Sequence, residues 1–432
     1  MKRFASYVGV LAAASTWLAP QAAPELPGAK YHLYGGSTHA HTSYTWSHGD
    51  HLTTNGCAGI LTYERDPSSG ADHWSDGYVA AGKGCPAILV IHGVQVHAPG
   101  VRVKPDWTSF QGPPAAHFSR AKAAGYDFYA VTDHSQEIAF QPTGPDTAAW
   151  MDTKQQAAAA SDNRFVGLAG FELSENDGPG GTGHINVFNS ADMLNALQQG
   201  VNLPVFYKWL TTARANGDGP VLASFNHPDP DQYASWANRD ARVTDAITML
   251  EVINSNNKIH YPAFINALDH GWKVSPVAGD DNHGFARIAK DMSRTLLLTT
   301  ALTKTGLLDA MQHRRTYASL DTNLQCRYSV NGAIMGSTLD RPTTFRFDIA
   351  ITDPDAGNPK DRITRIDIVK DKGVVVQTYS PTPSYTVRWT PSVDDAAATY
   401  FFVRVWTAGG GDAPGADPAN PVAWLAPVWT GR

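Results

Sequence analysis

Histidine and carboxylate side chains recur at the ends of short apolar segments in the first 300 residues of this chain. The segment "THAHTS" contains His39 and His41, and "YAVTDH" ends with Asp133 and His134. Side chains two positions apart on a strand lie on the same face, which suits them to hold one ion. The pattern continues at five further positions: Glu172, His184, His227, Asp281 and His283. Imidazoles and carboxylates are the usual ligands of Zn, Mn and Fe.

The number of these residues indicates more than one ion. A carboxylate from Glu172 or Asp281 could bridge two metals about 3.5–4 Å apart. A bridged pair lowers the pKa of a bound water, and the resulting hydroxide would attack an electrophile. We expect catalytic roles for His134, which could protonate the leaving group, and for Asp133, which would orient a ligand or the substrate.

Strand-like and helix-like segments alternate from Tyr34 to about Thr300, which predicts parallel α/β units. So many units favour a closed barrel, over residues 30–318, rather than an open doubly wound sheet. The carboxyl ends of barrel strands are where active sites lie, and most of the candidate ligands are expected there. Helices are predicted over five segments: Ala115–Gly125, Thr147–Ser161, Ala191–Gly200, Pro204–Asn216 and Tyr261–Gly271.

Residues 49–112 interrupt this alternation with a segment rich in Gly, Pro and aromatic residues. Its position between the first strand and the first helix predicts an insertion that could form a lid or a pocket wall. Cys57 and Cys85 lie in it and are the natural pair for a disulfide in an oxidising compartment. Cys326 is expected to be a buried, inert thiol.

Residues 319–432 have a different sequence pattern from the residues before them. Apolar and polar residues alternate with a period of two between Pro, Gly and Asp turns, which predicts an antiparallel β-sandwich. No cluster of metal-ligand type stands out there, so packing or support is its expected role.

Residues 1–23 resemble a secretory signal peptide, because Lys2 and Arg3 precede an apolar stretch and then small residues. This predicts a periplasmic or secreted location, and no later apolar run is long enough to predict a membrane span. The 432-residue chain has 34 Lys and Arg against 40 Asp and Glu, a net charge of −6. A nucleic-acid platform is therefore not expected.

Taken in order, six segments resemble the metal motifs of the PHP (polymerase and histidinol phosphatase) superfamily: "THAHTS", "YDFYAVTDHS", "GFELSE", "GTGHINVF", "FNHPD" and "AGDDNHG". The resemblance covers about residues 33–300. It implies a distorted seven-stranded (β/α) barrel, two or three divalent ions (Zn, Mn or Fe) and hydrolysis of phosphoesters. With the signal peptide and the terminal sandwich, the chain looks most similar to the extracytoplasmic metallohydrolases of that family.

The resemblance also implies how the ligands are shared. The first ion would be held by four residues: His39, His41, Glu172 and Asp281. The second would be held by Glu172, His184 and His227. The third would be held by His134, His283 and a residue from the loop after the first motif, where His48 is the first choice and His51 or Asp50 are alternatives. Asp281, rather than Asp280, aligns with the family's ligand.

Three functions are compatible with this pattern. The favoured one is a phosphoesterase that acts on a small-molecule ester. A carbamate or carboxylic ester hydrolase would use the same metal site on a carbonyl carbon, and a metal-dependent binding protein would have no turnover. The complete set of ligands favours an enzyme. Glu251, at the end of the sixth strand, is also placed to point towards the site.

Overall fold

The computed structural model describes residues 27–45, 112–140, 143–174 and 182–432, together with the backbone of six short strands between positions 52 and 103. The signal peptide predicted over residues 1–23, the third-ion candidates His48, Asp50 and His51, and the pair Cys57 and Cys85 lie outside the described residues. None of the helices described is long and apolar enough to cross a membrane.

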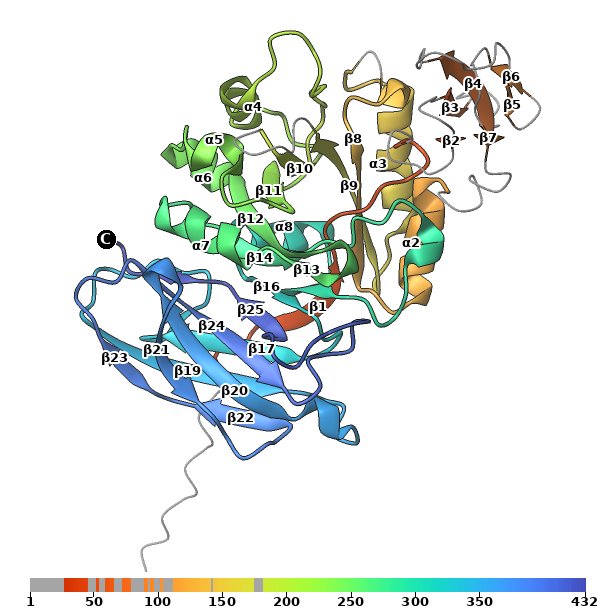
Figure 1. The fold of residues 1–432 in the computed structure, drawn as a ribbon. Helices are drawn as coiled ribbons and strands as arrows, with labels where there is room; N and C mark the ends of the chain where they lie inside the picture. The colour runs from red at the N-terminus through yellow and green to blue at the C-terminus, as the bar shows by residue number, and fades with distance from the viewer. Residues whose placement is uncertain are drawn as a thin grey trace, which may run out of the picture.

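One mixed sheet runs through the molecule (Figure 1), and it pairs strands in the order β13-β12-β11-β10-β9-β8-β1-β15-β16 before it continues into the C-terminal region. The strands of this part are β1 (His32–Ser37), β8 (Phe128–His134), β9 (Val166–Leu173), β10 (His184–Phe188), β11 (Leu222–Asn226), β12 (Ile247–Asn254), β13 (Lys258–Ile259), β14 (Ser275–Ala278), β15 (Arg294–Thr299) and β16 (Thr316–Ser319).

The strands are not uniformly parallel, which corrects the expectation of regular parallel units. β8 pairs in parallel with β1 and β9, and β12 pairs in parallel with β11 and β14. β10, however, is antiparallel to both β9 and β11, and β15 is antiparallel to β1. Only residues 174–183 join β9 to β10, which is shorter than the dozen or more residues that a parallel crossover requires, so the chain returns in the opposite direction.

The sheet bends until β14 meets β15 and β16. The Thr295 hydroxyl donates to the carbonyl of Ala278 at 2.8 Å, and the Thr316 hydroxyl donates to the carbonyl of Pro276 at 2.9 Å. The structure is thus a mixed α/β fold in which large sheets dominate, and the seven-stranded barrel stays a prediction.

Helices cover the outside of this sheet and one of its ends. They are α2 (Pro114–Ala123), α3 (Ala148–Ala160), α4 (Leu203–Leu210), α5 (Gln232–Trp236), α6 (Ala241–Ala246), α7 (Tyr261–Asp269) and α8 (Lys304–Gln312). Short 3-10 turns are η1 (Ile138–Phe140), η2 (Ser255–Asn257), η3 (Phe285–Arg287), η4 (Pro359–Asp361) and η5 (Asp371–Gly373). α5 is a left-handed turn, with φ between 52° and 63° at residues 233–236.

The helix predicted over Ala191–Gly200 is wrong, and the one over Pro204–Asn216 is too long. Residues 191–200 form turns, and the amide of Ala196 donates to the Ser135 hydroxyl rather than to a helical carbonyl. α4 ends at Leu210, where the hydroxyls of Thr211 and Thr212 bond back to the carbonyl of Lys208. Local side-chain bonds of this kind compete with helix continuation.

The C-terminal region is built from antiparallel strands. They are β17 (Gln325–Val330), β18 (Ala333–Ile334), β19 (Thr344–Thr352), β20 (Ile363–Lys370), β21 (Val374–Tyr379), β22 (Thr386–Trp389), β23 (Ser392–Asp394), β24 (Tyr400–Thr407), β25 (Ala423–Leu425) and β26 (Val428–Trp429). β17, β18, β19, β22 and β23 form a second sheet, whereas β20, β21, β24, β25 and β26 extend the large sheet through the pairing of β16 with β25.

The two sheets share an apolar core, in which the rings of Phe345 on β19 and Phe401 on β24 lie 4.6 Å apart between centroids. The sandwich predicted for residues 319–432 therefore shares its large sheet with the N-terminal part. Cys326 is fully buried in this core, as expected, and burial raises the pKa of its thiol well above the usual value.

In the predicted insertion, the structure gives strands β2 (Leu52–Thr53), β3 (Gly59–Arg65), β4 (Asp72–Tyr78), β5 (Leu89–Ile91), β6 (Val94–Val96) and β7 (Arg102–Val103). They pair as β2 with β7, β3 with β4, and β5 with β6, apart from the large sheet. The role of this segment as a lid stays a prediction.

Candidate metal centre

Successive side chains of a strand point to opposite faces of the sheet, and on β8 this decides which residues share a face with the candidate ligand His134. On β8, Tyr129 and Val131 pack against residues of α2 and α3, while Phe128 and Ala130 join a cluster that includes Leu307 and Met311 of α8. Side chains two apart share a face, so His134 lies on the same face as Phe128 and Ala130. Asp133 lies on the opposite face.

On four further strands of the bent sheet, apolar residues of the same cluster again share a face with polar residues of the candidate site. The cluster around α8 takes Val166 and Leu168 from β9, Phe188 from β10, Leu222 from β11 and Met249 from β12. At the other end of the same faces stand Glu172, His184, Asn226 and Glu251. On this face of the bent sheet, apolar side chains therefore pack together near one end of the strands, and ligand-type side chains lie nearer the other end.

Glu172 lies at the centre of these residues and is fully buried. Its Oε1 atom is 3.2 Å from Nε2 of His39, 3.3 Å from Nδ1 of His184 and 3.6 Å from Nε2 of His227. Its Oε2 atom is 3.1 Å from Nε2 of His134. Burial alone would raise the pKa of Glu172, but the neighbouring histidines hold it well below its usual range.

A second carboxylate, Asp281, joins the cluster from the loop after β14. Its Oδ1 atom is 3.0 Å from Nε2 of His41, 3.6 Å from Nε2 of His39 and 3.9 Å from Nδ1 of His283. Despite burial, His39 and His41 keep the pKa of Asp281 well below its ordinary value. The loop is fixed to the first motif because the Asp281 amide donates to the His39 carbonyl at 3.0 Å.

His134 lies between two carboxylates. Its Nε2 faces Glu172, and its Nδ1 is 3.4 Å from Oε1 of Glu137. Burial opposes the charged ring, but the hydrogen bonds with Glu137 and Glu172 raise the pKa of His134 to about 9. Its ring centroid is 4.5 Å from that of His41 and 6.0 Å from that of His283.

Glu251 orients two of the histidines from behind. Its Oε1 is 2.9 Å from Nδ1 of His39, and its Oε2 accepts from the amide of His227 at 2.8 Å. Burial lowers the pKa of His39, but Glu251 and the other carboxylates raise it well above the usual value. A carboxylate behind a ligand histidine fixes which ring nitrogen faces the ion.

Gly279 permits this arrangement. A Cβ atom at this position would lie 1.9 Å from Oε1 of Glu251 and 2.7 Å from Cβ of His39. The glycine of "AGDDNH" is therefore required for the close approach of the β14 end to the first motif.

Asp133, turned to the outer face, supports the loop that carries His41. It accepts from the amide of Thr42 at 2.6 Å, from its hydroxyl at 2.8 Å and from the Thr45 hydroxyl at 2.8 Å. The Thr45 hydroxyl in turn accepts from the amide of His134 at 2.9 Å. Burial raises the pKa of Asp133 to about 6. These contacts agree with the expected orienting role of Asp133, which stays a prediction.

Asp280 points away from the ligand cluster. The Tyr126 hydroxyl donates to its Oδ2 atom at 3.1 Å, and its amide donates to the Ser37 hydroxyl at 3.0 Å. This placement agrees with the choice of Asp281, rather than Asp280, as the candidate ligand.

The candidate ligands differ in how far their side chains are exposed. The side chains of His39, His41 and Glu172 are at most 1% exposed, whereas those of His227, Asp281 and His283 are 16–20% exposed. A substrate would approach from this second set. His227 and Asp281 also have positive φ values, of 30° and 49°. Backbone strain at two non-glycine residues of one cluster is a common property of functional sites.

The geometry fits divalent metals. Four overlapping groups have candidate ligand atoms within 4.8 Å of one another: His39, His41 and Asp281; His39, Glu172 and His227; His134, Glu172 and His184; and His41, His134 and His283. The donors are imidazole nitrogens and carboxylate oxygens, the set that Zn, Mn and Fe prefer. All eight candidate ligands in the described residues therefore come together. His48 lies outside those residues.

Three supporting residues were not predicted from the sequence. Glu137 is one turn beyond His134, the Ser174 hydroxyl donates to Oε2 of Glu172 at 2.7 Å, and Asn226 donates to Oε1 at 2.7 Å. Each lies within three residues of a predicted ligand. Their closeness to the motifs in the sequence was the signal that could have identified them.

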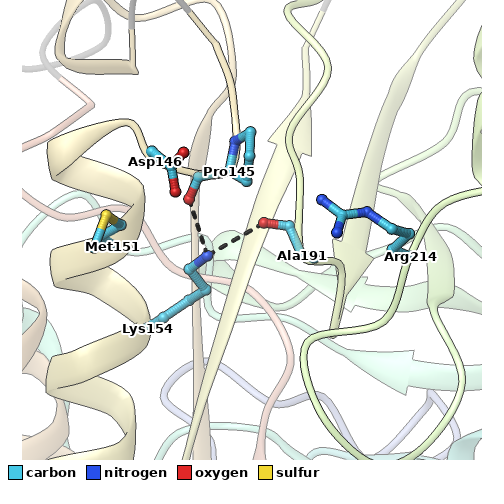
Figure 2. A pocket seen from close by; sticks show the side chains of 6 residues that line it. All are labelled: Pro145, Asp146, Met151, Lys154, Ala191 and Arg214. Atoms are coloured by element: carbon cyan, nitrogen blue, oxygen red, sulfur yellow. Dashed lines mark hydrogen bonds between the residues drawn. The ribbon is translucent and has the colours of Figure 1, made fainter.

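A pocket of about 480 Å³ lies elsewhere, beyond the end of β10 that is opposite His184 (Figure 2). The Lys154 amino group donates there to the carbonyls of Pro145 and Ala191, at 3.3 and 3.2 Å. None of the residues that line this pocket is a candidate metal ligand. They are Pro145, Asp146, Met151, Lys154, Ala191 and Arg214.

No protein-family model matches the chain, and no curated protein matches it. Several solved structures are similar to it. One is a two-domain protein from Bacteroides vulgatus ATCC 8482 that contains a predicted PHP-like metal-dependent phosphoesterase. It has 13% identity and a TM-score of 0.41 over 94% of this chain and 97% of that one.

Two further similar structures cover less of the chain. PsfC from Pseudomonas syringae PB-5123 has 14% identity and a TM-score of 0.31 over 46% of this chain and 80% of that one. A protein from Bifidobacterium adolescentis ATCC 15703, named for a proposed metal-dependent phosphoesterase activity, has 12% identity and a TM-score of 0.24 over 41% and 85%. The candidate ligand set rests on the sequence motifs and on the distances between the side chains.

Proposed function

We propose that this chain is a metal-dependent hydrolase whose ions are held by the histidine–carboxylate cluster. The observation that carries the proposal is the position of Glu172. Its two oxygens face separate sets of imidazoles, His39, His184 and His227 on one side and His134 on the other. This is the arrangement expected of a carboxylate that bridges two ions.

Bound ions would lower the pKa of water to give a nucleophile and would neutralise charge that develops on the substrate. Asp281 and His41 complete the ligand set, and Glu251 would keep His39 in the ligating orientation. His134 can hold a proton between Glu172 and Glu137, which suits it to protonate a leaving oxygen when two ions are bound. With three ions, we assign it to the ligands of the third, together with His283 and His48.

The substrate that we favour is a small phosphoester, a monoester or a diester, because the order of motifs resembles the PHP superfamily. The proposal includes a PHP-type barrel over residues 30–318 and a sandwich over 319–432. It also includes export to the periplasm or the medium, supported by the pattern of residues 1–23.

The test combines metal analysis with three substrates. Purified chain is measured for Zn, Mn and Fe by mass spectrometry, and then assayed with a bis-aryl phosphodiester, an aryl monophosphate and an aryl carbamate. We expect at least two ions per chain and the fastest turnover on a phosphoester. Glu172→Gln removes the charge without changing the shape and should lower kcat/KM by about 10³-fold. Asp291→Asn, an exposed carboxylate, is the matched control.

Other outcomes distinguish the alternatives. Fastest turnover on the carbamate would assign the site to carbonyl chemistry. Full metal content without turnover on any ester would indicate a binding protein. Fewer than two ions in a chain that still hydrolyses phosphoesters would contradict the bridging role of Glu172.

A further inference from the structure

A second group of ligand-type side chains lies in the C-terminal region, far along the chain from the histidines. Carboxylate oxygens of Asp321, Asp361 and Asp412 lie within 4.8 Å of one another. Asp321 lies between β16 and β17, Asp361 ends η4 before β20, and Asp412 lies between β24 and β25. Asp353, directly after β19, is close enough for its charge to raise the pKa of Asp321.

Two of these aspartates have a buried oxygen without a protein partner. The residues Asp353 and Asp361 are 2% and 3% exposed, and the Oδ2 atom of each makes no hydrogen bond. The Oδ1 atom of the neighbouring Asn323 is also buried without a partner. A buried carboxylate oxygen is costly unless it is paired or binds a metal. Three orphan oxygens close to one cluster therefore indicate a missing cation.

None of the protein cations in the described residues forms an ion pair with Asp321, Asp353, Asp361 or Asp412. Lys360 is, however, near enough to act on the charge of Asp361. Burial raises the pKa of Asp321 to about 7 and that of Asp353 to about 6, and the neighbouring carboxylates add to both shifts. The carboxylates therefore destabilise one another's charged forms.

Hydrogen bonds already order the side chains of Asp321 and Asp412 and leave other carboxylate oxygens available. Oδ1 of Asp321 accepts from the amides of Asn323 and Leu324 at 3.0 and 2.8 Å. Oδ2 of Asp412 accepts from the Thr322 hydroxyl at 2.7 Å. These bonds hold the side chains in place before any ion binds, which lowers the ordering cost of binding.

We propose that Asp321, Asp353, Asp361 and Asp412 bind one Ca²⁺ ion, with the Asn323 side-chain carbonyl as a further ligand. All the donors are oxygens, which favours a hard cation over the transition metals of the histidine cluster. Ca²⁺ takes six to eight oxygens at about 2.3–2.6 Å, so ligands on opposite sides of the ion lie up to about 5 Å apart. The candidate atoms of Asp321, Asp361 and Asp412, all within 4.8 Å of one another, are close enough to share one such ion. Mg²⁺ prefers fewer protein ligands and several waters.

The ion would join the two sheets. The loop with Asp321 leads from β16 of the large sheet to β17 of the second sheet, and the loop with Asp353 and Asp361 leads back from β19 to β20. A cation held between these connections and the β24–β25 loop would tie them together. Its expected effect is on stability rather than on hydrolysis.

The test measures thermal unfolding of the full chain in EGTA and after addition of CaCl2 or MgCl2. For the wild type we expect 1 mM free Ca²⁺ to raise the Tm by about 2–4 °C, and Mg²⁺ to give less than half of that rise. Asp361→Asn and Asp353→Asn should lose the calcium response. In EGTA both variants should be at least as stable as the wild type, because the substitution removes a repulsive charge. Titration calorimetry with CaCl2 should lose one site in each variant.

His41→Ala is the matched control and should keep the full calcium response, since its side chain belongs to the other cluster. A wild type that shows neither a Tm rise nor calorimetric binding of Ca²⁺ would overturn the proposal, as would an undiminished response in Asp361→Asn. An equal response to Mg²⁺ would overturn the choice of calcium. Variants less stable than the wild type in EGTA would show that these aspartates act through protein contacts instead.

Discussion

The histidine–carboxylate cluster and the C-terminal aspartate cluster both gather side chains that are distant in the sequence, but they do so with different donors. The first combines imidazole nitrogens with the carboxylates of Glu172 and Asp281. The second contains only oxygens, from Asp321, Asp361 and Asp412. Donor softness selects the ion, so the first cluster suits a metal that activates water and the second suits a hard structural cation.

The two clusters also differ in how they are held. Ligands of the first stand at strand ends of the bent sheet, or directly beyond them, and a further carboxylate, Glu251, fixes the ring of His39. Ligands of the second lie in connections, and backbone amides and a hydroxyl fix Asp321 and Asp412. Rigid placement matters more where a reaction must be aligned than where an ion only cross-links loops. The comparison predicts that each cluster can be disabled while the other remains intact.

The largest expected effect comes from selective chelation. 1,10-Phenanthroline binds transition metals through nitrogen and has little affinity for Ca²⁺, so it should remove the ions of the histidine cluster alone. Hydrolysis of the phosphoester should fall by about 10³-fold or more, whereas the calcium-dependent rise in Tm should persist. Activity should return when Zn or Mn is added back. Loss of both properties in phenanthroline would show that the clusters are coupled.

Glu251→Gln should have an intermediate effect. The substitution keeps the shape but removes the charge that orients His39, so we expect metal affinity or kcat/KM to fall by about 10–100-fold. Metal titration and steady-state kinetics measure both quantities. Asp361→Asn, the corresponding change in the aspartate cluster, should leave kcat/KM unchanged. An unaltered Glu251→Gln enzyme would exclude a positioning role for this carboxylate.

Asp133→Asn should have the smallest effect of the three. Asp133 contacts Thr42 and Thr45 rather than the candidate ligands, and the amide can still accept from one of them. We expect kcat/KM to fall by about 10-fold with little change in metal content. A change in kcat with an unchanged pH profile would fit a positioning role. A loss as large as that of Glu172→Gln would indicate direct participation in the reaction.

Much of the candidate site could be predicted because its residues obey a local rule. A strand alternates its faces, so the position of His134 or Glu172 relative to the apolar residues before it decides which side it occupies. The helix over Ala191–Gly200 could not be excluded in this way, because the contacts that replace it come from the distant Ser135. The direction of β10 was also missed, since hydrophobic pattern does not distinguish parallel from antiparallel neighbours.

The aspartate cluster was missed for a similar reason. Asp321, Asp361 and Asp412 have no common spacing, and each lies among turn residues where aspartate is ordinary. Only the packing of the two sheets brings their connections to one place. The structure therefore corrects the expectation that the C-terminal region contains no group of metal-ligand type.

The order of motifs, the alternation within each strand and the types of donor were determined by the sequence alone, because they depend on residues a few positions apart. The tertiary structure decided the bend of the sheet, the meeting of Glu172 with five histidines, and the grouping of the C-terminal aspartates. These features depend on which strands pair and how far the sheet twists. That outcome is set by the packing of the whole chain rather than by any one segment.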